Sequence, residues 1–138
     1  KARYFSRFVN YPVISDDSGL CIKSLKNKPG IYSARLAKKK GSFFNAMIFI
    51  LKKLKNKRDR AATFNCSLSF KFPNKKIVSV EGKIKGQISK KIIGKNGFGY
   101  DPIFIPKNKK LTFGQMSTSE KYKIDHRFKA YKKIKKFF

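Results

Sequence analysis

The sequence predicts one domain that combines strands with amphipathic helices. A period-2 pattern of apolar residues indicates a strand over residues 60–72, and a broad apolar stripe indicates a helix over residues 42–56. No repeat, low-complexity linker or shift in composition marks a domain boundary within the 138 residues. With 41% hydrophobic residues, including 14 phenylalanines, the chain has enough apolar side chains to form a core.

The first predicted elements are a helix and an interrupted strand. Residues 1–9 carry apolar side chains at helical spacing, so the sequence is expected to begin inside a helix, as a fragment without its N-terminal part. Two short apolar runs, residues 13–15 and 20–22, are expected to flank a turn at residues 16–19. The three lysines at 38–40 are expected to lie in a solvated loop.

The middle of the chain predicts a helix followed by two strands. Ser42 is a suitable N-cap for the helix that runs to about Asn56. After the strand at 60–72, a turn leads into a second strand that reaches Ile88. Gly82 and Gly86 lie within this second strand, where glycine indicates a bulge or a close backbone contact.

Two capped helices are predicted near the C-terminus. Ser117 or Thr118 is a suitable cap for a short helix, and Asp125 is a suitable cap for the last helix. Phe128 and Tyr131 lie on one side of this last helix together with Ile134 and Phe138, and lysines occupy its other faces. The last helix is therefore expected to pack by one side only.

The chain is strongly basic. It has 35 Lys and Arg residues against 7 Asp and Glu residues, a formal net charge of +28. Such a charge attracts polyanions and phosphates without identifying one. Codon bias in an AT-rich genome would also produce this excess of lysine, so the charge alone leaves both origins open.

Cysteine usage and apolar runs point to a cytoplasmic protein with no membrane partner. Cys21 and Cys66 lack metal-ligand spacing and are expected to be free thiols. No signal peptide is visible, and the longest apolar run, residues 43–51, is far shorter than the roughly 20 residues that span a bilayer.

The most informative motif is Gly97-Phe98-Gly99-Tyr100-Asp101-Pro102. Its glycines allow a close approach of the backbone to a ligand. An aromatic face can stack on a flat heterocycle while a carboxylate accepts hydrogen bonds. The motif predicts a pocket for a planar polar ring, and the alternative is a glycine-rich hairpin or bulge.

Two further clusters of polar residues are candidates for the same site. The adjacent acids Asp16 and Asp17 are oxygen ligands of the kind that Mg²⁺ prefers, although an Asx-turn would also explain them. Arg127, in the first turn of a helix, can donate to a carbonyl or a phosphate, whereas a lone residue such as His126 is more often structural.

Together these segments resemble the inosine/xanthosine triphosphate pyrophosphatase family over nearly the whole chain. The residues that carry the resemblance are Asp16-Asp17-Ser18-Gly19-Leu20, Pro29 to Arg35, Phe64-Asn65-Cys66, Glu81-Gly82 with Gly86, Gly97 to Phe104, Thr112-Phe113, Met116-Ser117, Glu120-Lys121 and His126-Arg127. The resemblance implies an elongated α/β fold with a long mixed sheet flanked by helices and a nucleotide cleft between two lobes. It also implies a Mg²⁺-dependent homodimer.

The resemblance also implies an activity and a role for individual residues. The family hydrolyses dITP, ITP and XTP to the monophosphate and pyrophosphate. Asp17 would be the metal ligand and the proton acceptor for the attacking water, with Asp16 in support. The substrate contacts would come from Ser18, Phe98, Gly99, Tyr100, Asp101, Lys121, His126 and Arg127.

The family begins with a strand and a phosphate-binding loop that residues 1–138 do not contain. The chain is therefore expected to be a single domain lacking both, and two alternatives to the enzyme remain. One is a basic nucleic-acid-binding protein, in which aromatic rings stack on bases and lysines follow phosphates. The other is an inactive nucleotide-binding fragment. The enzyme itself is expected to have no specific nucleic-acid partner.

Overall fold

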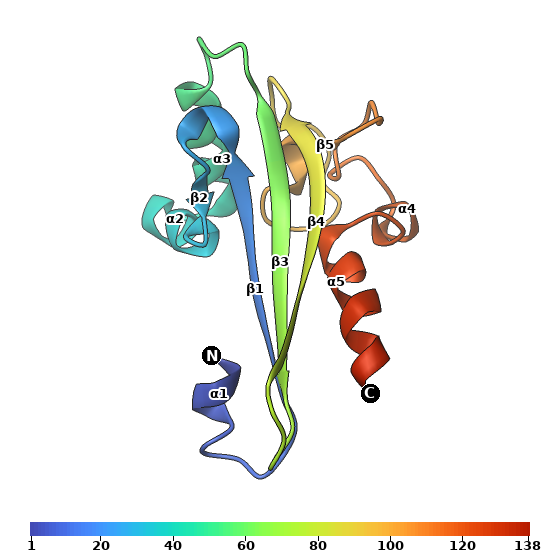
Figure 1. Cartoon of the computed structure of the whole chain (residues 1–138). Coiled ribbons are helices and arrows are strands. Elements are labelled where there is room, and N and C mark those ends of the chain that lie inside the picture. The colour runs from blue at the N-terminus through green and yellow to red at the C-terminus, as the bar shows by residue number, and fades with distance from the viewer.

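A computed structural model describes residues 1–138. Its three long strands, of 10 or 11 residues each, run along the length of the molecule (Figure 1). The strands are β1 (Val13–Ile22), β2 (Lys28–Gly30), β3 (Ala61–Lys71), β4 (Val78–Ile88) and β5 (Phe104–Pro106). The α-helices are α1 (Ala2–Phe5), α2 (Ser33–Lys40), α3 (Phe43–Lys53), α4 (Thr118–Tyr122) and α5 (His126–Ile134). Three single turns of 3-10 helix complete the chain, at Lys23–Leu25, Asp101–Ile103 and Lys135–Phe137.

The five strands form one sheet in the order β2-β1-β3-β4-β5. The α/β class expected from the sequence is confirmed. All four strand pairings are antiparallel, so within these residues the sheet is not mixed as the resemblance implied. Helices α2 and α3 lie beside the β1 end of the sheet and α5 lies beside β4 (Figure 1).

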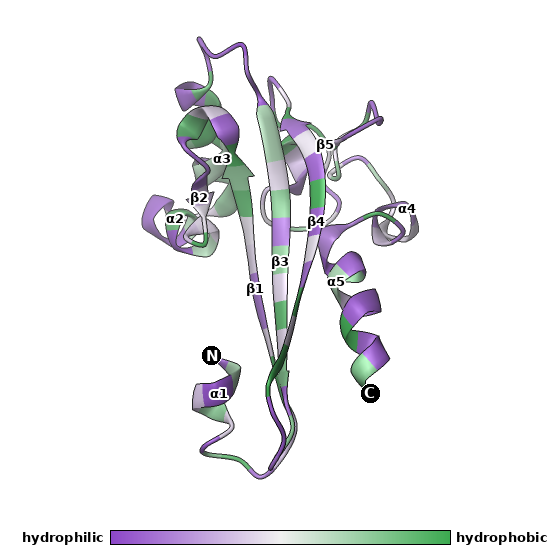
Figure 2. Ribbon diagram, viewed as in Figure 1, coloured by the Kyte–Doolittle hydropathy of each residue, from purple (hydrophilic) through white to green (hydrophobic).

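The side chains of the long strand β3 alternate between a buried inner face and a more exposed outer face of the sheet. Ala62, Phe64, Cys66 and Leu68 are buried, and the residues between them are less so, which is the expected period-2 pattern. The same alternation is visible as bands of colour along β3 (Figure 2). Inner-face side chains therefore supply the core.

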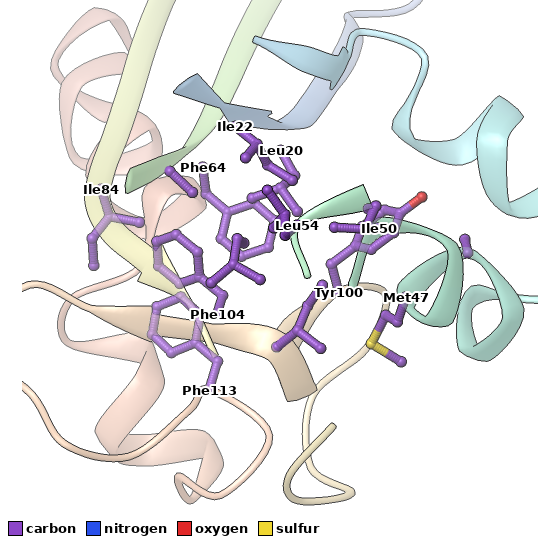
Figure 3. Close-up of a cluster of buried hydrophobic side chains, with 14 of the residues drawn as sticks. Leu20, Ile22, Met47, Ile50, Leu54, Phe64, Ile84, Tyr100, Phe104 and Phe113 are labelled. Atoms are coloured by element: carbon purple, nitrogen blue, oxygen red, sulfur yellow. The ribbon is translucent and has the colours of Figure 1, made fainter. Parts of the chain in front are cut away.

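The core has a large part under α3 and a small part under α5. Sixteen buried residues form the large cluster, in which the rings of Phe64, Phe104 and Phe113 lie together (Figure 3). Cys66 and Leu68 continue this inner face to the second cluster, where they meet Ala130 and Ile134 of α5. The helix α5 is thus fixed on the same face of the sheet as the main core.

The helix caps predicted from the sequence are present in the structure. Ser42 Oγ accepts a hydrogen bond from the Asn45 N–H at 3.0 Å, and Ser117 forms a reciprocal capping box with Glu120. Asp125 accepts from the Phe128 N–H at 2.6 Å and so begins α5 at His126. These caps determine where the functional residues at the helix starts lie.

Three expectations about elements were wrong. Residues 16–19 form no turn, because β1 continues through them in unbroken register with β3. Lys38–Lys40 belong to the last turn of α2 rather than to a loop. The helix expected over residues 1–9 is only the short α1, and Phe8 beyond it is exposed.

Both cysteines are free, as expected, and Cys66 is buried. None of the helices combines the length and apolarity that crossing a bilayer would need.

Candidate nucleotide site

The motif at residues 97–102 forms a tight turn that leads into a single helical turn rather than a hairpin. Gly97 and Gly99 have φ values of +72° and +65°, in the left-handed region that favours glycine. A Cβ at Gly97 would lie 2.0 Å from a carboxylate oxygen of Asp101. The glycine therefore lets the turn fold directly over this carboxylate.

Asp101 is the centre of this turn and is almost fully buried. One of its oxygens accepts from the Phe98 N–H at 2.9 Å and from Lys121 Nζ at 2.6 Å. Burial raises the pKa of Asp101, while the Lys121 ammonium and the Phe98 N–H act against that rise. The pair links the turn to α4, and it places the Lys121 ammonium 5.0 Å from the centre of the Phe98 ring.

Tyr100 lines the site mainly as a structural residue. Its hydroxyl donates to the Ser33 carbonyl at 2.6 Å, and its ring packs edge-on against Phe43 with centroids 5.3 Å apart. Burial raises the pKa of Tyr100 to about 12. The hydroxyl therefore stays protonated and joins the motif to α2.

His126 opens α5 in a buried position. Its ring stacks on Phe64 with centroids 4.8 Å apart and planes 10° from parallel. Burial, helped by the charges of Arg127 and Lys121, lowers the pKa of His126 to about 3. The imidazole is therefore neutral, and its buried Nδ1 has no hydrogen-bond partner.

Arg127 projects beside the motif from the next position of α5. Its Nε donates to Asp16 at 2.8 Å, and its guanidinium carbon lies 4.6 Å from the centre of the Phe98 ring. Phe98 is itself 58% exposed. A solvent-facing aromatic ring thus has a guanidinium and an ammonium against it.

Two hollows meet at the contact between Phe98 and Arg127, and both residues line both hollows. The smaller has a volume of about 100 Å³ and is lined by thirteen residues, among them Ser18, Gly99, Tyr100, Asp101 and His126. The larger, of about 780 Å³, adds Asp16, Lys121 and aromatic residues of α4 and α5. The eight residues expected to contact substrate therefore gather in one region.

Asp17 is not part of these hollows. Strand alternation places Asp16 and Ser18 on the inner face, with Leu20, and Asp17 on the outer face. The half-exposed Asp17 carboxylate forms an ion pair with Lys1. Because Asp16 and Asp17 face opposite sides of the sheet, their two carboxylates do not form a shared metal site. No group of three or more His, Cys, Asp and Glu residues is close enough to hold a metal ion.

Two residues that shape the site, Phe64 and Gly82, could be predicted from the sequence only in general terms. Phe64 is recognisable as an inward residue of a period-2 strand, but its stacking on His126 depends on where α5 packs. Gly82 marks a close contact, as expected: a Cβ there would lie 2.0 Å from the His126 carbonyl oxygen. This glycine lets the first turn of α5 rest on β4.

Comparison with known proteins shows to which family this chain belongs. A model of the Ham1 family matches residues 1–137. A protein of Bacillus subtilis named dITP/XTP pyrophosphatase is 42% identical over 138 residues, covering 99% of this chain and 70% of that protein. A Bacillus licheniformis protein of the same name is 41% identical, covering 97% of this chain and 69% of its own length.

Solved structures agree with the sequence comparison. The Staphylococcus aureus Ham1 protein superimposes with a TM-score of 0.92 at 38% identity, covering 99% of this chain and 71% of that one. A HAM1 protein from Coxiella burnetii gives a TM-score of 0.91 at 31% identity. The chain belongs to the Ham1 family, which confirms the resemblance seen in its motifs.

Proposed function

We propose that this protein hydrolyses deaminated purine nucleoside triphosphates, dITP, ITP and XTP, to the monophosphate and pyrophosphate. The observation that carries the proposal is the set of residues around the Phe98–Arg127 contact, in a chain about 40% identical to proteins named dITP/XTP pyrophosphatase. These matches favour nucleotide hydrolysis over the nucleic-acid-binding alternative suggested by the charge.

Recognition of the base follows from donors placed beside an aromatic face. Phe98 offers an exposed ring for stacking, and the guanidinium of Arg127 only donates hydrogen bonds. Hypoxanthine and xanthine carry a 6-keto oxygen that accepts such a bond. Adenine carries an amino group there, and two donors facing each other cost roughly 1–3 kcal/mol.

The phosphates have a path from the base site to Asp17 across the edge of β1. Strand β2 pairs with β1 only at residues 20–22, so residues 13–19 have no strand on that side. The Leu20 N–H points away from β3, towards Ser33 Oγ at 2.9 Å. Because backbone directions repeat every two residues, the Ser18 N–H points to the same open edge and is free to donate to a phosphate.

The surroundings of Asp17 suit a cation. The Lys1 ammonium already pairs with this half-exposed carboxylate, which shows that positive charge is accommodated there. Mg²⁺ is commonly held by one or two carboxylates together with substrate phosphates and waters. Asp17 would be its protein ligand, and the ion would spread the charge that develops on the phosphates.

In the reaction we propose, a water oxygen bonds to the α-phosphorus while the bond from that phosphorus to the bridging oxygen breaks. The bridging oxygen and the electron pair of the broken bond leave with pyrophosphate. Asp17 accepts the proton of the attacking water. The lysines of this strongly basic chain add a field that favours the anionic substrate and leaving group.

The remaining parts of the proposal follow the family resemblance. The metal is Mg²⁺, the active form is a homodimer, and the compartment is the cytoplasm. Size-exclusion chromatography with light scattering tests the dimer, and replacement of Mg²⁺ by Ca²⁺ in the assay tests the metal.

The activity is tested by pyrophosphate release from dITP, XTP and dATP, using the protein as its genome encodes it. We expect the first two substrates to be strongly preferred, and Asp17→Asn to lower kcat by at least about 100-fold because the proton acceptor is lost. Glu81→Gln, an exposed carboxylate on the same outer face, is the matched control. Equal turnover of dATP, or full activity of Asp17→Asn, would contradict the proposal.

A further inference from the structure

The two adjacent acids of β1 face opposite sides of the sheet. Asp17 lies on the outer face, whereas Asp16 lines the larger hollow on the inner face. The family resemblance gives Asp16 only a supporting role beside Asp17. A strand, however, places neighbouring side chains on opposite faces, where they meet different groups. The surroundings of Asp16 therefore have to be considered separately.

The Asp16 carboxylate is held by donors from three elements. It accepts from Ser18 Oγ of β1 at 2.5 Å, from Arg127 Nε of α5 at 2.8 Å, and more weakly from Cys66 Sγ of β3 at 3.7 Å. These three donors fix the orientation of the Asp16 carboxylate.

The contact made by Asp16 determines which N–H groups of Arg127 remain free to bind a ligand. Only Nε is engaged by the carboxylate, and a guanidinium is a rigid planar fork with five N–H donors. Anchoring Nε fixes that plane beside Phe98, 4.6 Å from the ring centre. The terminal nitrogens remain available to a ligand in the adjoining hollows.

We propose that Asp16 is a positioning residue for base recognition, which holds Arg127 so that its terminal N–H groups meet the 6-keto oxygen. This rests on the function proposed above. The paired acids then divide the substrate between them, with Asp16 acting on the base through Arg127 and Asp17 acting on the phosphates. Asp16 contributes nothing to the metal requirement.

The test compares Asp16→Asn and Asp17→Asn in the protein as its genome encodes it. Three quantities are measured: kcat/KM for dITP, kcat/KM for dATP, and the Mg²⁺ concentration that gives half-maximal activity. We expect Asp16→Asn to lower kcat/KM for dITP by about 10- to 100-fold, as misplacement of a positioned group does. The value for dATP should change little, so the preference falls while the Mg²⁺ requirement stays the same.

A binding measurement gives a readout that does not depend on turnover. Calorimetric titration with dIMP in the absence of metal should show weaker binding to Asp16→Asn and unchanged binding to Glu81→Gln. Because Asp16 is partly exposed, we expect the variant to fold, and its thermal unfolding curve checks this.

A double-mutant cycle with Arg127→Lys tests whether Asp16 acts through Arg127. The Lys variant keeps the charge but loses the planar fork, so adding Asp16→Asn to it should cost at most about twofold more. Independent, multiplying losses would overturn the inference.

Three other results bear on this inference and on the proposed function. An Asp16→Asn variant that keeps the wild-type base preference, or needs more Mg²⁺, would overturn this inference and leave the function standing. A wild-type protein that hydrolyses dATP as readily as dITP would overturn both.

Discussion

At the scale of single residues, His126 shows how burial keeps a titratable side chain uncharged. The ring is buried against Phe64, with two cations nearby, and these surroundings lower its pKa to about 3. A neutral imidazole beside the base site offers one donor and one acceptor. The hydrogen-bonding pattern of His126 is therefore constant over the physiological pH range.

The buried His126 predicts a specific dependence of stability on pH. It is the single histidine of the chain, and its unfolded-state pKa is about 6.5. Below that pH the unfolded chain binds a proton that the folded chain does not, so stability is full above pH 6.5 and is lost as the pH falls towards 3. We expect the free energy of unfolding to fall by about 2 kcal/mol between pH 7.5 and pH 5 because of this proton.

Urea unfolding at the two pH values measures this difference, with His126→Phe as the comparison. The aromatic replacement retains the stacking partner for Phe64 but cannot titrate. If the variant loses as much stability at pH 5 as the wild type, the neutral buried state assigned to His126 is wrong.

At the scale of elements, the site depends on how closely α5 approaches β4. Gly82 has no side chain at the point where the His126 carbonyl and the Ala130 N–H would lie 2.0 Å and 2.5 Å from a Cβ. The Asp125 cap starts the helix, and Gly82 sets its distance from the sheet. Together they determine where His126 and Arg127 lie.

Replacing Gly82 by Ala should therefore affect both stability and selectivity. The methyl group forces α5 away from backbone atoms that cannot adjust, and overpacking of this kind costs about 1–3 kcal/mol or more. We expect a lower urea midpoint and a reduced preference for dITP over dATP. Lys85→Ala, at an exposed position of the same strand, should change neither, and a neutral Gly82→Ala would contradict this account of the helix contact.

The sequence predicted most elements because their signals are local. The alternation in β3 and the caps at Ser42, Ser117 and Asp125 depend only on neighbouring residues, and all were confirmed. The turn expected at residues 16–19 was wrong because Asp, Ser and Gly commonly form turns, whereas here pairing with β3 keeps the segment extended. Tertiary pairing outweighed local preference.

The site, too, could be predicted only as far as local sequence signals allow. The motifs indicated which residues take part, and the eight expected substrate contacts lie together around two hollows. They did not indicate that Asp16 and Asp17 face apart, because that follows only from the strand conformation. The roles of these residues, the Mg²⁺ cofactor, the homodimer, the cytoplasmic location and the single domain without its N-terminal strand stay predictions.

At the scale of the whole molecule, charge is the dominant feature. The net charge of the 138 residues is +28. A hollow of about 490 Å³ on the outer face is itself lined by Lys23, Lys85, Lys107 and Lys109, but it has no aromatic ring. The field attracts phosphates over the whole surface, and the region around Phe98 combines it with an exposed aromatic ring that offers a stacking face.

This charge predicts that substrate capture depends on salt while the chemical step does not. Raising KCl from low to about 0.5 M shortens the Debye length to a few ångströms and should lower kcat/KM for dITP on the order of 10-fold. The value of kcat should change little, because groups in direct contact with the substrate are screened less. Steady-state kinetics at fixed free Mg²⁺ measure both, and a salt-independent kcat/KM would show that the charge has no part in capture.

The central claim is that one nucleotide spans β1, with its base at Arg127 and its phosphates at Asp17. A crystal structure of the protein as its genome encodes it, with a non-hydrolysable ITP analogue and Mg²⁺, tests this most directly. We predict the base against Phe98, its 6-keto oxygen within hydrogen-bonding distance of Arg127, and the phosphates beside Asp17. A base bound in the lysine-lined hollow of the outer face, or phosphates on the same face as Asp16, would contradict the account.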